Sequence, residues 1–391
     1  MMSMFSLGFL VLAGSTALSL ATPANRDPAF EVSVTAPTEV QSIDDIMVTA
    51  AVTNIGSEDV KVLKFGTILD NHYPTRSFTV SKDGLVANFT GIKLQIDLDV
   101  LDDFAYVVIP AGETVIVEHE VASLYNFEEL GTGAFEFEPV TDFQVVAADA
   151  KPNAYKVSAG KVKVNVKSDV SQREMKTHEK RARVSCTNSS ESSFISSSYS
   201  EGKSLASIVV NYISSNGADS LYRSYFGSSP TSTVLDVFSA VAGENSRSRM
   251  LSCNDPYKIC SDPPGVIAYT MTPSTNIYFC SIFYREVTTS SLCNGTTVAS
   301  RSIRGGTVLH ELTHALSNTT DVGYGCSYDQ SLGMWSPSQA RSNADNYNCF
   351  ATQVYQNTQC AEQVAPSEGI VSRILDAVSA LGSLGDRLVQ S

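Results

Sequence analysis

The cysteines of this chain are confined to its second half, and this asymmetry constrains the fold more than any other feature. All eight cysteines lie between positions 186 and 360 of 391, and residues 1–185 contain none. A single continuous domain would not be expected to segregate one residue type in this way, and this length exceeds what one hydrophobic core usually organises. The chain is therefore predicted to be multi-domain, with two independently built halves.

The charge balance excludes several classes of partner. The chain carries 27 Lys and Arg against 41 Asp and Glu, a formal net charge of −14. Residues 1–181 hold 15 basic against 25 acidic residues and residues 182–391 hold 12 against 16, so the acidity belongs mainly to the front part. A surface that neutralises phosphate or anionic lipid carries the opposite sign. Neither nucleic acid nor a membrane surface is an expected partner.

The N-terminus predicts export. Residues 5–20 form an uncharged apolar run, and Ser19-Leu20-Ala21 has the small-x-small pattern of a signal-peptidase site, which predicts a signal peptide over residues 1–21 and a secreted, extracellular protein. No Lys or Arg precedes the run, so a membrane anchor or a buried helix is the alternative. In an oxidising compartment an even number of cysteines indicates disulfides. Four bridges and no free thiol are expected.

Residues 22–181 are predicted to form a β-rich domain. Apolar or alternating runs rich in β-branched residues recur between Gly, Pro, Asn and Asp, at residues 30–34, 46–52, 60–65, 114–117 and 162–166. An antiparallel sandwich fits this pattern best. A polar, charge-dense stretch over residues 168–183 follows, which is typical of an exposed linker.

The linker contains the dibasic pair Lys180-Arg181. In an exposed linker of an exported protein such a pair invites a processing protease, and an ordinary solvated charge cluster is the alternative. Its place at the domain boundary favours processing. Residues 22–181 are therefore predicted to be a propeptide, and the active species to begin near Ala182 or Val184.

Residues 182–391 are predicted to form a mainly helical α+β domain. Apolar residues recur at helical spacing over residues 205–213 and 234–241, and Ser336-Pro337-Ser338-Gln339 has the cap, first-turn Pro and N3 Gln of a helix start. This helix would carry Asp345 and reach Ala351. From about residue 361 an amphipathic stretch is expected to form a helical extension, and its charged residues exclude a membrane span.

The residues that carry chemistry are His310, Glu311 and His314, in a His-Glu-x-x-His pattern. On a helix, side chains at i and i+4 project from one face, so both imidazoles can bind one Zn²⁺ and Glu311 can take a proton from the water at the metal. A surface or core helix with two His is the alternative. The other histidines lie in or before the linker and would be lost on processing: His72, His119 and His178.

The third ligand of such a metal has to be a carboxylate, because a catalytic Zn²⁺ takes three protein ligands and the cysteines are assigned to bridges. Thr320 stands where a metzincin places a third His, and neither Glu362 nor Glu368 has the helical context of a thermolysin-like ligand. Asp321, seven residues after His314, and Asp345, on the following helix, are the candidates. The residues alone leave both open.

Three successive motifs resemble those of a known family. They are His-Glu-Leu-Thr-His at 310–314, Thr-Thr-Asp-Val-Gly-Tyr-Gly at 319–325 and Asn-Ala-Asp-Asn-Tyr at 343–347. Together they look like the motifs of the deuterolysins, also called aspzincins or neutral protease 2, which are secreted fungal zinc endopeptidases. The resemblance covers about residues 186–360. The layout of signal, propeptide, dibasic site and Cys-rich zincin metalloprotease domain also resembles the family precursor.

The resemblance implies a role for each candidate site residue. One Zn²⁺ per chain would be held by His310, His314 and Asp321, with Glu311 as general base. Tyr324 would donate a hydrogen bond to the transition state, and Tyr284 resembles another Tyr associated with catalysis. Asp345 matches a family Asp implicated in activity, either as a substrate-pocket acid, as in some members, or as a metal contact.

The chain also departs from the family pattern. Asn318 occupies a position where the family usually has Gly, and the loop from His314 to Asp321 is short. The resemblance implies the bridges Cys186–Cys253, Cys260–Cys280 and Cys293–Cys360. Eight cysteines exceed the three bridges typical of the family, so Cys326–Cys349 would be an additional bridge between the two acidic motifs.

The expected function is zinc-dependent hydrolysis of internal peptide bonds by a secreted, monomeric proenzyme. Its expected partners are polypeptide substrates, with basic proteins favoured as in the family, and its own propeptide. The alternative is a secreted two-domain binding protein whose helical domain has lost catalysis. Metal content separates the two hypotheses.

Overall fold

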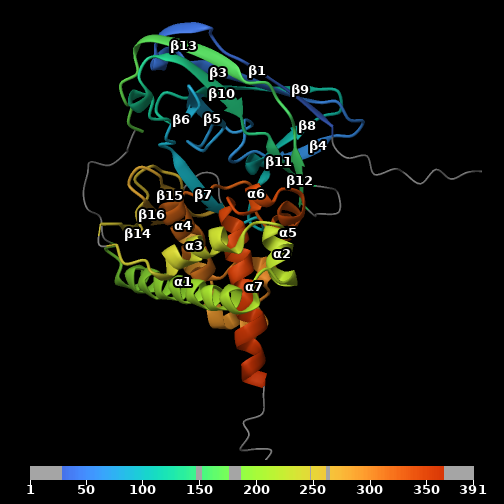
Figure 1. The fold of residues 1–391 in the computed structure, drawn as a ribbon, viewed down its shortest axis with the longest axis vertical. Coiled ribbons are helices and arrows are strands. Elements are labelled where there is room, and N and C mark those ends of the chain that lie inside the picture. Colours follow the sequence, from blue (N-terminus) through green and yellow to red (C-terminus); the bar gives the residue numbers. More distant parts are fainter. Residues whose placement is uncertain (1–28, 147–151, 176–185, 247, 261–264, 365–391) are drawn as a thin grey trace, which may run out of the picture.

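The computed structural model describes residues 29–146, 152–175, 186–246, 248–260 and 265–364 (Figure 1). The predicted signal peptide, the Lys180-Arg181 pair and the extension beyond residue 364 lie outside the described residues. Within the described ranges, no helix combines the length and the apolar character that crossing a membrane requires.

The first half of the described chain is built of β-strands. They are β1 (Phe30–Thr35), β2 (Glu39–Ser42), β3 (Met47–Asn54), β4 (Val60–Leu63), β5 (Phe78–Lys82), β6 (Leu85–Val86), β7 (Ile92–Ile96), β8 (Tyr106–Ile109), β9 (Thr114–Glu120), β10 (Gly133–Pro139), β11 (Asp142–Val146), β12 (Pro152–Lys156) and β13 (Val162–Asp169), with short 3₁₀ turns η1 (Ile43–Asp45), η2 (Asp103–Ala105) and η3 (Glu128–Leu130). All except β7 belong to three sheets, with strand orders β1-β3-β9, β2-β13-β10-β5-β6 and β12-β11-β4-β8. The β2–β13 pair is parallel, and the other pairs of these three sheets are antiparallel.

Alternation of side chains gives this half its core. Along β3 every second residue is buried, so Val48, Ala50 and Val52 face inward while the residues between them are only partly buried. They join one hydrophobic cluster that includes the large aromatic residues Phe135 and Phe143. The strands predicted at residues 30–34, 46–52, 60–65, 114–117 and 162–166 are confirmed as β1, β3, β4, β9 and β13.

The second half packs helices on a small sheet. Its elements are α1 (Ser189–Asn216), α2 (Ser220–Phe226), α3 (Thr231–Ala242), β14 (Leu251–Ser252), β15 (Val266–Met271), β16 (Asn276–Phe279), η4 (Ser281–Arg285), η5 (Thr289–Cys293), η6 (Val298–Ser300), α4 (Arg304–Ser317), α5 (Cys326–Trp335), α6 (Pro337–Ala340) and α7 (Ala344–Val364). The sheet is mixed, with the order β14-β16-β15-β7. The arrangement is α+β, so the expectation of a mainly helical domain is not supported. The sequence did not reveal β15 because all six of its residues are buried, which removes the alternation of a half-exposed strand.

Two further expectations need correction. The helix predicted from Ser336 is interrupted after α6, and α7 begins only at Ala344. At the break Thr320 bonds to the backbone of Ser342 and Ala344, and the side chain of Asn343 bonds to the backbone of residues 322 and 323. The predicted linker also starts too early. Residue Asp169 still belongs to β13, and Arg173 forms ion pairs with Asp44 (2.7 Å) and Asp169 (2.6 Å), which hold this segment on the front sheets.

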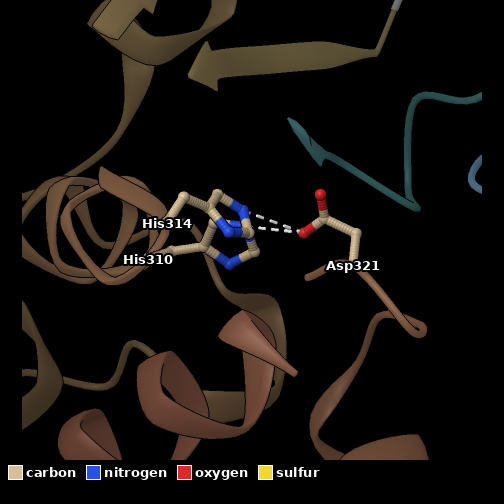
Figure 2. A group of neighbouring side chains, drawn as sticks. All are labelled: His310, His314 and Asp321. Atoms are coloured by element: carbon tan, nitrogen blue, oxygen red, sulfur yellow. Dashed lines mark hydrogen bonds and ion pairs between the residues drawn. The ribbon is translucent and has the colours of Figure 1, made fainter. Parts of the chain in front are cut away.

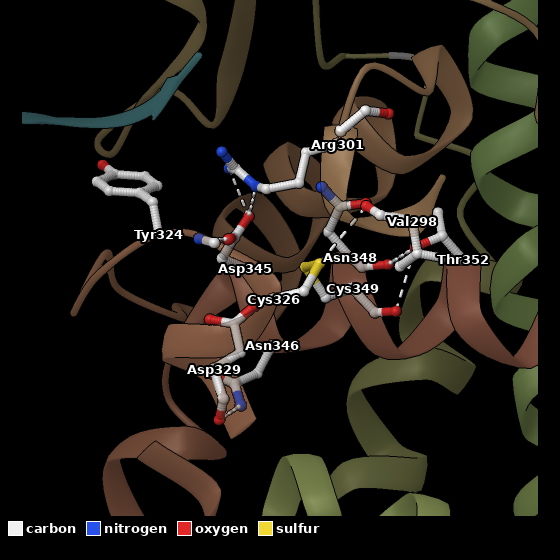
Figure 3. The surroundings of a disulfide bond; sticks show 12 residues. Val298, Arg301, Tyr324, Cys326, Asp329, Asp345, Asn346, Asn348, Cys349 and Thr352 are labelled. Atoms are coloured by element: carbon white, nitrogen blue, oxygen red, sulfur yellow. Dashed lines mark hydrogen bonds and ion pairs between the residues drawn. A yellow bond between two sulfur atoms is a disulfide. The ribbon is translucent and has the colours of Figure 1, made fainter. Parts of the chain in front are cut away.

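The four predicted disulfides are confirmed. The bridges are Cys186–Cys253, Cys260–Cys280, Cys293–Cys360 and Cys326–Cys349, and no cysteine is free. All four lie within the second half. The last bridge joins the start of α5 to α7, next to the two acidic motifs (Figure 3).

Each half has its own hydrophobic core, and a third cluster joins them. Strand β7 comes from the front half by sequence, yet it pairs antiparallel with β15. It lies beside β15, among the elements of the second half (Figure 1). The joining cluster contains Leu63, Phe65, Tyr73, Ile92, Leu94, Ile96 and Ala105 from the front half, and Ile259, Val266, Tyr269, Met271, Tyr278, Cys280 and Tyr324 from the second. The halves are therefore not independent, because one sheet is built from both.

Candidate metal and catalytic site

Helix α4 carries the His-Glu-x-x-His residues in the interior, which confirms that this pattern is helical. Residues 305–314 of α4 are all buried. Close approach of neighbouring helices requires small residues: a Cβ on Gly306 would lie 2.2 Å from Asn348 Oδ1 of α7. The imidazoles of His310 and His314 lie one turn apart with ring centroids separated by 4.7 Å. Close packing thus fixes the helix that presents both rings.

The end of α4 turns the chain back toward these rings. Asn318 adopts a left-handed conformation (φ 54°), and its N–H donates to the carbonyl of His314 (3.2 Å). Asn tolerates this region better than most residues, so it can form this turn where the resemblance places Gly. Thr320 then pairs with the start of α7: its N–H donates to the carbonyl of Ser342 (2.7 Å) and its carbonyl accepts from Ala344 (3.0 Å). These bonds fix the segment that carries Asp321.

The three candidate ligand atoms meet at one point (Figure 2). Asp321 Oδ1 lies 3.1 Å from the Nε2 atoms of both His310 and His314, and the two Nε2 atoms lie 3.1 Å apart. Tetrahedral zinc with bonds of about 2.0–2.1 Å places its ligand atoms about 3.3 Å apart. Two imidazoles and one carboxylate are also a donor set that zinc accepts. The side chains therefore fit the metal that the sequence predicted.

The other nitrogen of each ring shows how the rings are oriented. His314 Nδ1 lies 2.9 Å from the carbonyl oxygen of Thr319, which is an acceptor, so Nδ1 carries the proton and Nε2 is left as the ligand. His310 Nδ1 lies 3.7 Å from Asp345 Oδ1 and has no hydrogen-bond partner. A carboxylate behind a metal-binding imidazole is the usual support for such a ring.

Burial and mutual contact shift the pKa values within this cluster. Burial lowers the pKa of His314 to about 4, which keeps it neutral. Burial alone would raise the pKa of Asp321, but the two imidazoles lower it below its ordinary value. Burial would lower the pKa of His310, but its contacts with Asp321 and Asp345 raise it to about 9. Metal binding requires the ligating nitrogen of each imidazole to be free of its proton.

One carboxylate oxygen of Glu311 accepts a hydrogen bond, and the other has no hydrogen-bond partner. Thr270 of β15 donates its hydroxyl hydrogen to Glu311 Oε2 (2.5 Å), while Oε1 is buried and unpartnered. Burial raises the pKa of Glu311 to about 8. A carboxyl group whose pKa lies near neutrality can exchange a proton during a reaction. Glu311 is thus suited to acid–base chemistry beside the two imidazoles.

Asp345 faces Arg301 (Figure 3) and also lies next to the His310 ring. It is fully buried at the start of α7, and its Oδ1 accepts from Arg301 Nη2 (2.6 Å) and Nε (3.1 Å). Its Oδ2 accepts from the N–H of Gly325 (2.6 Å). Burial would raise the pKa of Asp345, but Arg301 and His310 lower it. The carboxylate faces Arg301 and His310, which does not favour the substrate-pocket role that the resemblance implied.

The two predicted tyrosines lie in different surroundings. Tyr324 is buried next to Asp321, and its hydroxyl donates to the carbonyl of Leu94 (2.9 Å). Tyr284 lies in η4 and packs against Phe194 and Phe283, with a buried hydroxyl that has no hydrogen-bond partner. The structure brings Tyr324 to the cluster and does not bring Tyr284 there.

Sequence reasoning missed three residues that hold the site. Thr270 orients Glu311, Arg301 neutralises Asp345, and Asn343 Oδ1 accepts from the N–H of Val322 beside Asp321 (2.9 Å). None of them belongs to the His-Glu-x-x-His pattern. Asn343 alone carried a signal, since it opens the third motif of the resemblance.

The sequence of the chain was compared with those of known protein families and proteins. The model of the deuterolysin metalloprotease (M35) family matches residues 2–360. The chain belongs to the deuterolysin metalloprotease family. A peptidyl-Lys metalloendopeptidase from Armillaria mellea is 30% identical over 89% of this chain and 98% of its own length. A neutral protease 2 homolog from Pyricularia oryzae is 28% identical over 89% and 97%, and a peptidyl-Lys metalloendopeptidase from Grifola frondosa is 26% identical over 85% and 95%.

Solved structures match only weakly. The CARDB domain of a Pyrococcus furiosus protein, crystallised with di-metal ions, covers 39% of this chain at 11% identity with a TM-score of 0.18. This likeness supports no statement about fold or function. Membership of the family establishes a metalloendopeptidase, and the alternative of a binding protein without catalysis is not supported.

Proposed function

We propose that this deuterolysin is a secreted, zinc-dependent endopeptidase with one Zn²⁺ per chain, made as a proenzyme. The observation that carries the proposal is the meeting of His310 Nε2, His314 Nε2 and Asp321 Oδ1 at mutual distances of 3.1 Å. His310, His314 and Asp321 would hold the Zn²⁺, which when bound supplies the Lewis acidity that lowers the pKa of a water and polarises a peptide carbonyl.

The chain's own residues supply the proton transfers. Glu311 Oε1, which has no partner, accepts the proton of the attacking water, while Thr270 holds Oε2 in place. Glu311 then passes the proton to the leaving amine as the peptide bond breaks. Tyr324 donates its hydroxyl hydrogen to the oxygen of the attacked carbonyl, as it donates to the Leu94 carbonyl here. Asp345 keeps His310 in position, and Arg301 offsets its buried charge.

Secretion and processing complete the proposal. The apolar leader and four disulfides support an oxidising, extracellular destination. Residues 22–181 would be removed after Lys180-Arg181 to release the active species. A preference for basic substrates is proposed from relatives named for peptidyl-Lys bonds, and residues 182–391, which would remain after processing, carry 12 basic against 16 acidic residues.

Replacing Glu311 with Gln tests the proposal. Gln keeps the size of the side chain but cannot accept the water proton, so turnover of casein is expected to fall by at least about 100-fold. Zinc, measured by elemental analysis, is expected to remain at one per chain in both proteins. A zinc-free wild type without proteolytic activity would contradict the proposal, and a fully active Glu311→Gln variant would contradict the assigned base.

A further inference from the structure

Strand β7 lies at the catalytic cluster although it belongs to the front half. Its five residues are all buried, and it forms the end strand of the sheet β14-β16-β15-β7. The register pairs Leu94 with Tyr269 and Lys93 with Thr270, the residue that holds Glu311. The strand therefore runs past the site in extended form.

Both backbone polar groups of Leu94 are bonded to site residues. The N–H of Leu94 donates to Asp321 Oδ2 (2.9 Å), and its carbonyl accepts from the hydroxyl of Tyr324 (2.9 Å). Successive residues of a strand direct their polar groups to opposite edges, so β7 bonds to β15 on one edge and to the segment of Asp321 and Tyr324 on the other. The peptide carbonyl of Leu94 receives the very hydrogen bond that the proposed mechanism offers to a substrate carbonyl.

Side chains beside Leu94 also bind the second half. Lys93 Nζ donates to Asn318 Oδ1 (2.6 Å), and Gln95 Nε2 donates to Thr307 Oγ1 of α4 (3.1 Å). Lys93 is only 6% exposed. Burial lowers its pKa to about 8, although the carboxylates of Asp321 and Glu311 favour its charged form. A lysine side chain is thus accommodated beside the loop of Asn318, at a cavity that Asp321 also lines.

We propose that the edge of β15 together with Asp321, Tyr324 and Asn318 is the groove for an extended polypeptide, and that β7 occupies it as a substrate-mimicking strand. The intact chain is thereby inhibited by its own residues 92–96, and Asn318 contributes to recognition of a basic side chain. This proposal rests on the proposed endopeptidase function and names how the same site is regulated.

The physical basis is addition of a strand to a sheet edge. Removing β7 would leave β15 with a row of unpaired N–H and C=O groups, which is a template for another extended chain. While β7 is in place, His310 and Glu311 are completely buried. The cavity that remains next to Asp321 is about 180 Å³ and is lined by Lys93 and Leu94 themselves. Because β7 already pairs with this edge of β15, another extended chain can pair there only if β7 leaves it.

The test keeps the front half attached by replacing Lys180 and Arg181 with Gln. In this linker-blocked chain, Leu94→Pro removes the N–H that binds Asp321 and disturbs β7. The matched control is Ile116→Pro, which places the same disruption in β9, an end strand of the front sheet β1-β3-β9, at a residue that is 66% exposed. A second variant, Lys93→Ala with Gln95→Ala, removes side-chain contacts and retains every backbone bond of β7.

Two readouts are compared with the naturally processed protein. The first is casein hydrolysis, and the second is hydrogen–deuterium exchange of residues 266–271 in β15. We expect the linker-blocked chain to be inert, and Leu94→Pro to raise hydrolysis by at least about ten-fold and to accelerate exchange in β15. The double alanine variant is expected to change both readouts in the same direction by less. The control is expected to change neither.

Three results would overturn the proposal: full activity of the linker-blocked chain, no response of either readout to both β7 variants, or an equal response to Ile116→Pro. An inactive processed protein would instead count against the proposed function. In that event exchange in β15 still decides whether β7 occupies the groove, since faster exchange in the β7 variants alone would support it and unchanged exchange would refute it.

Discussion

At the scale of single residues, the site is defined by which carboxylate holds the metal and which holds an imidazole. Asp321 contacts both Nε2 atoms, whereas Asp345 lies behind His310 and is neutralised by Arg301. The two acids were equivalent candidates by residue type and spacing. Only the turn at Asn318 and the pairing of Thr320 with the start of α7 separate their positions.

Replacing each acid separates these two roles. Asp321→Ala removes a ligand atom, so zinc content and activity are both expected to be lost. Asp345→Asn is expected to weaken zinc binding by about 10–100-fold, as changes to the residues that support a ligand usually do, and to leave cleavage preference unchanged. Zinc titration against a chelator and mapping of cleaved peptides provide the measurements. Retention of zinc by Asp321→Ala with loss in Asp345→Asn would exchange the roles.

The buried carboxyl group of Glu286 is expected to make the stability of the fold depend on pH. Burial raises its pKa to about 8, with Thr307 and Arg301 lowering it and Asp97 raising it, and its Oε2 has no partner. Between its ordinary pKa of 4.5 and about 8, the folded chain holds a proton that the unfolded chain has released. The free energy of unfolding should therefore fall as pH rises through this window, by up to roughly 1.4 kcal/mol per pH unit.

Urea unfolding of the linker-blocked chain at pH 5 and pH 7.5 measures this slope. Glu286→Gln mimics the protonated form and should make the free energy of unfolding less dependent on pH in that range. An identical slope in the wild type and the variant would show that Glu286 does not titrate there.

At the scale of elements, the sequence predicted the helices and strands whose apolar residues recur with a regular period, and it missed the strands that are buried on both faces. The alternation of β3 and the i, i+4 spacing of the two histidines placed a strand and helix α4 correctly. Strand β15 has no exposed face, and β7 is likewise buried at every position, so neither carries an alternating pattern. The break between α6 and α7 depends on the hydrogen bonds of Asn343, which no local propensity reveals.

The turn after α4 gives a prediction at this scale. Asn318 has φ of 54°, which Gly adopts freely and a β-branched residue adopts only under strain. Asn318→Gly is expected to keep zinc binding, whereas Asn318→Val should lower the free energy of unfolding by about 1–2 kcal/mol. Thermal unfolding and zinc content of the two variants check this. Equal stability of the Gly and Val variants would contradict the importance of this turn.

At the scale of the whole molecule, the segregation of cysteines predicted two halves, and the structure adds that they share a sheet. The charges, cysteines and motifs identify which stretches of the sequence form each half. Pairing of β7 with β15 depends instead on contacts between segments about 170 residues apart, which the sequence pattern does not encode locally. The joining cluster buries apolar residues from both halves, and this burial holds them together.

The active species is expected to be the second half, released from the front half. Separation of the halves requires both a cut in the chain and loss of the contacts of β7, since four hydrogen bonds join Lys93, Leu94 and Gln95 to the second half besides the pairing with β15. The active protein is expected to begin near Ala182 or Val184, which N-terminal sequencing of the secreted material measures. Size-exclusion chromatography should separate it from residues 22–181. Full activity in a species that begins near residue 22 would contradict processing, because β7 would then still lie against Asp321 and Tyr324.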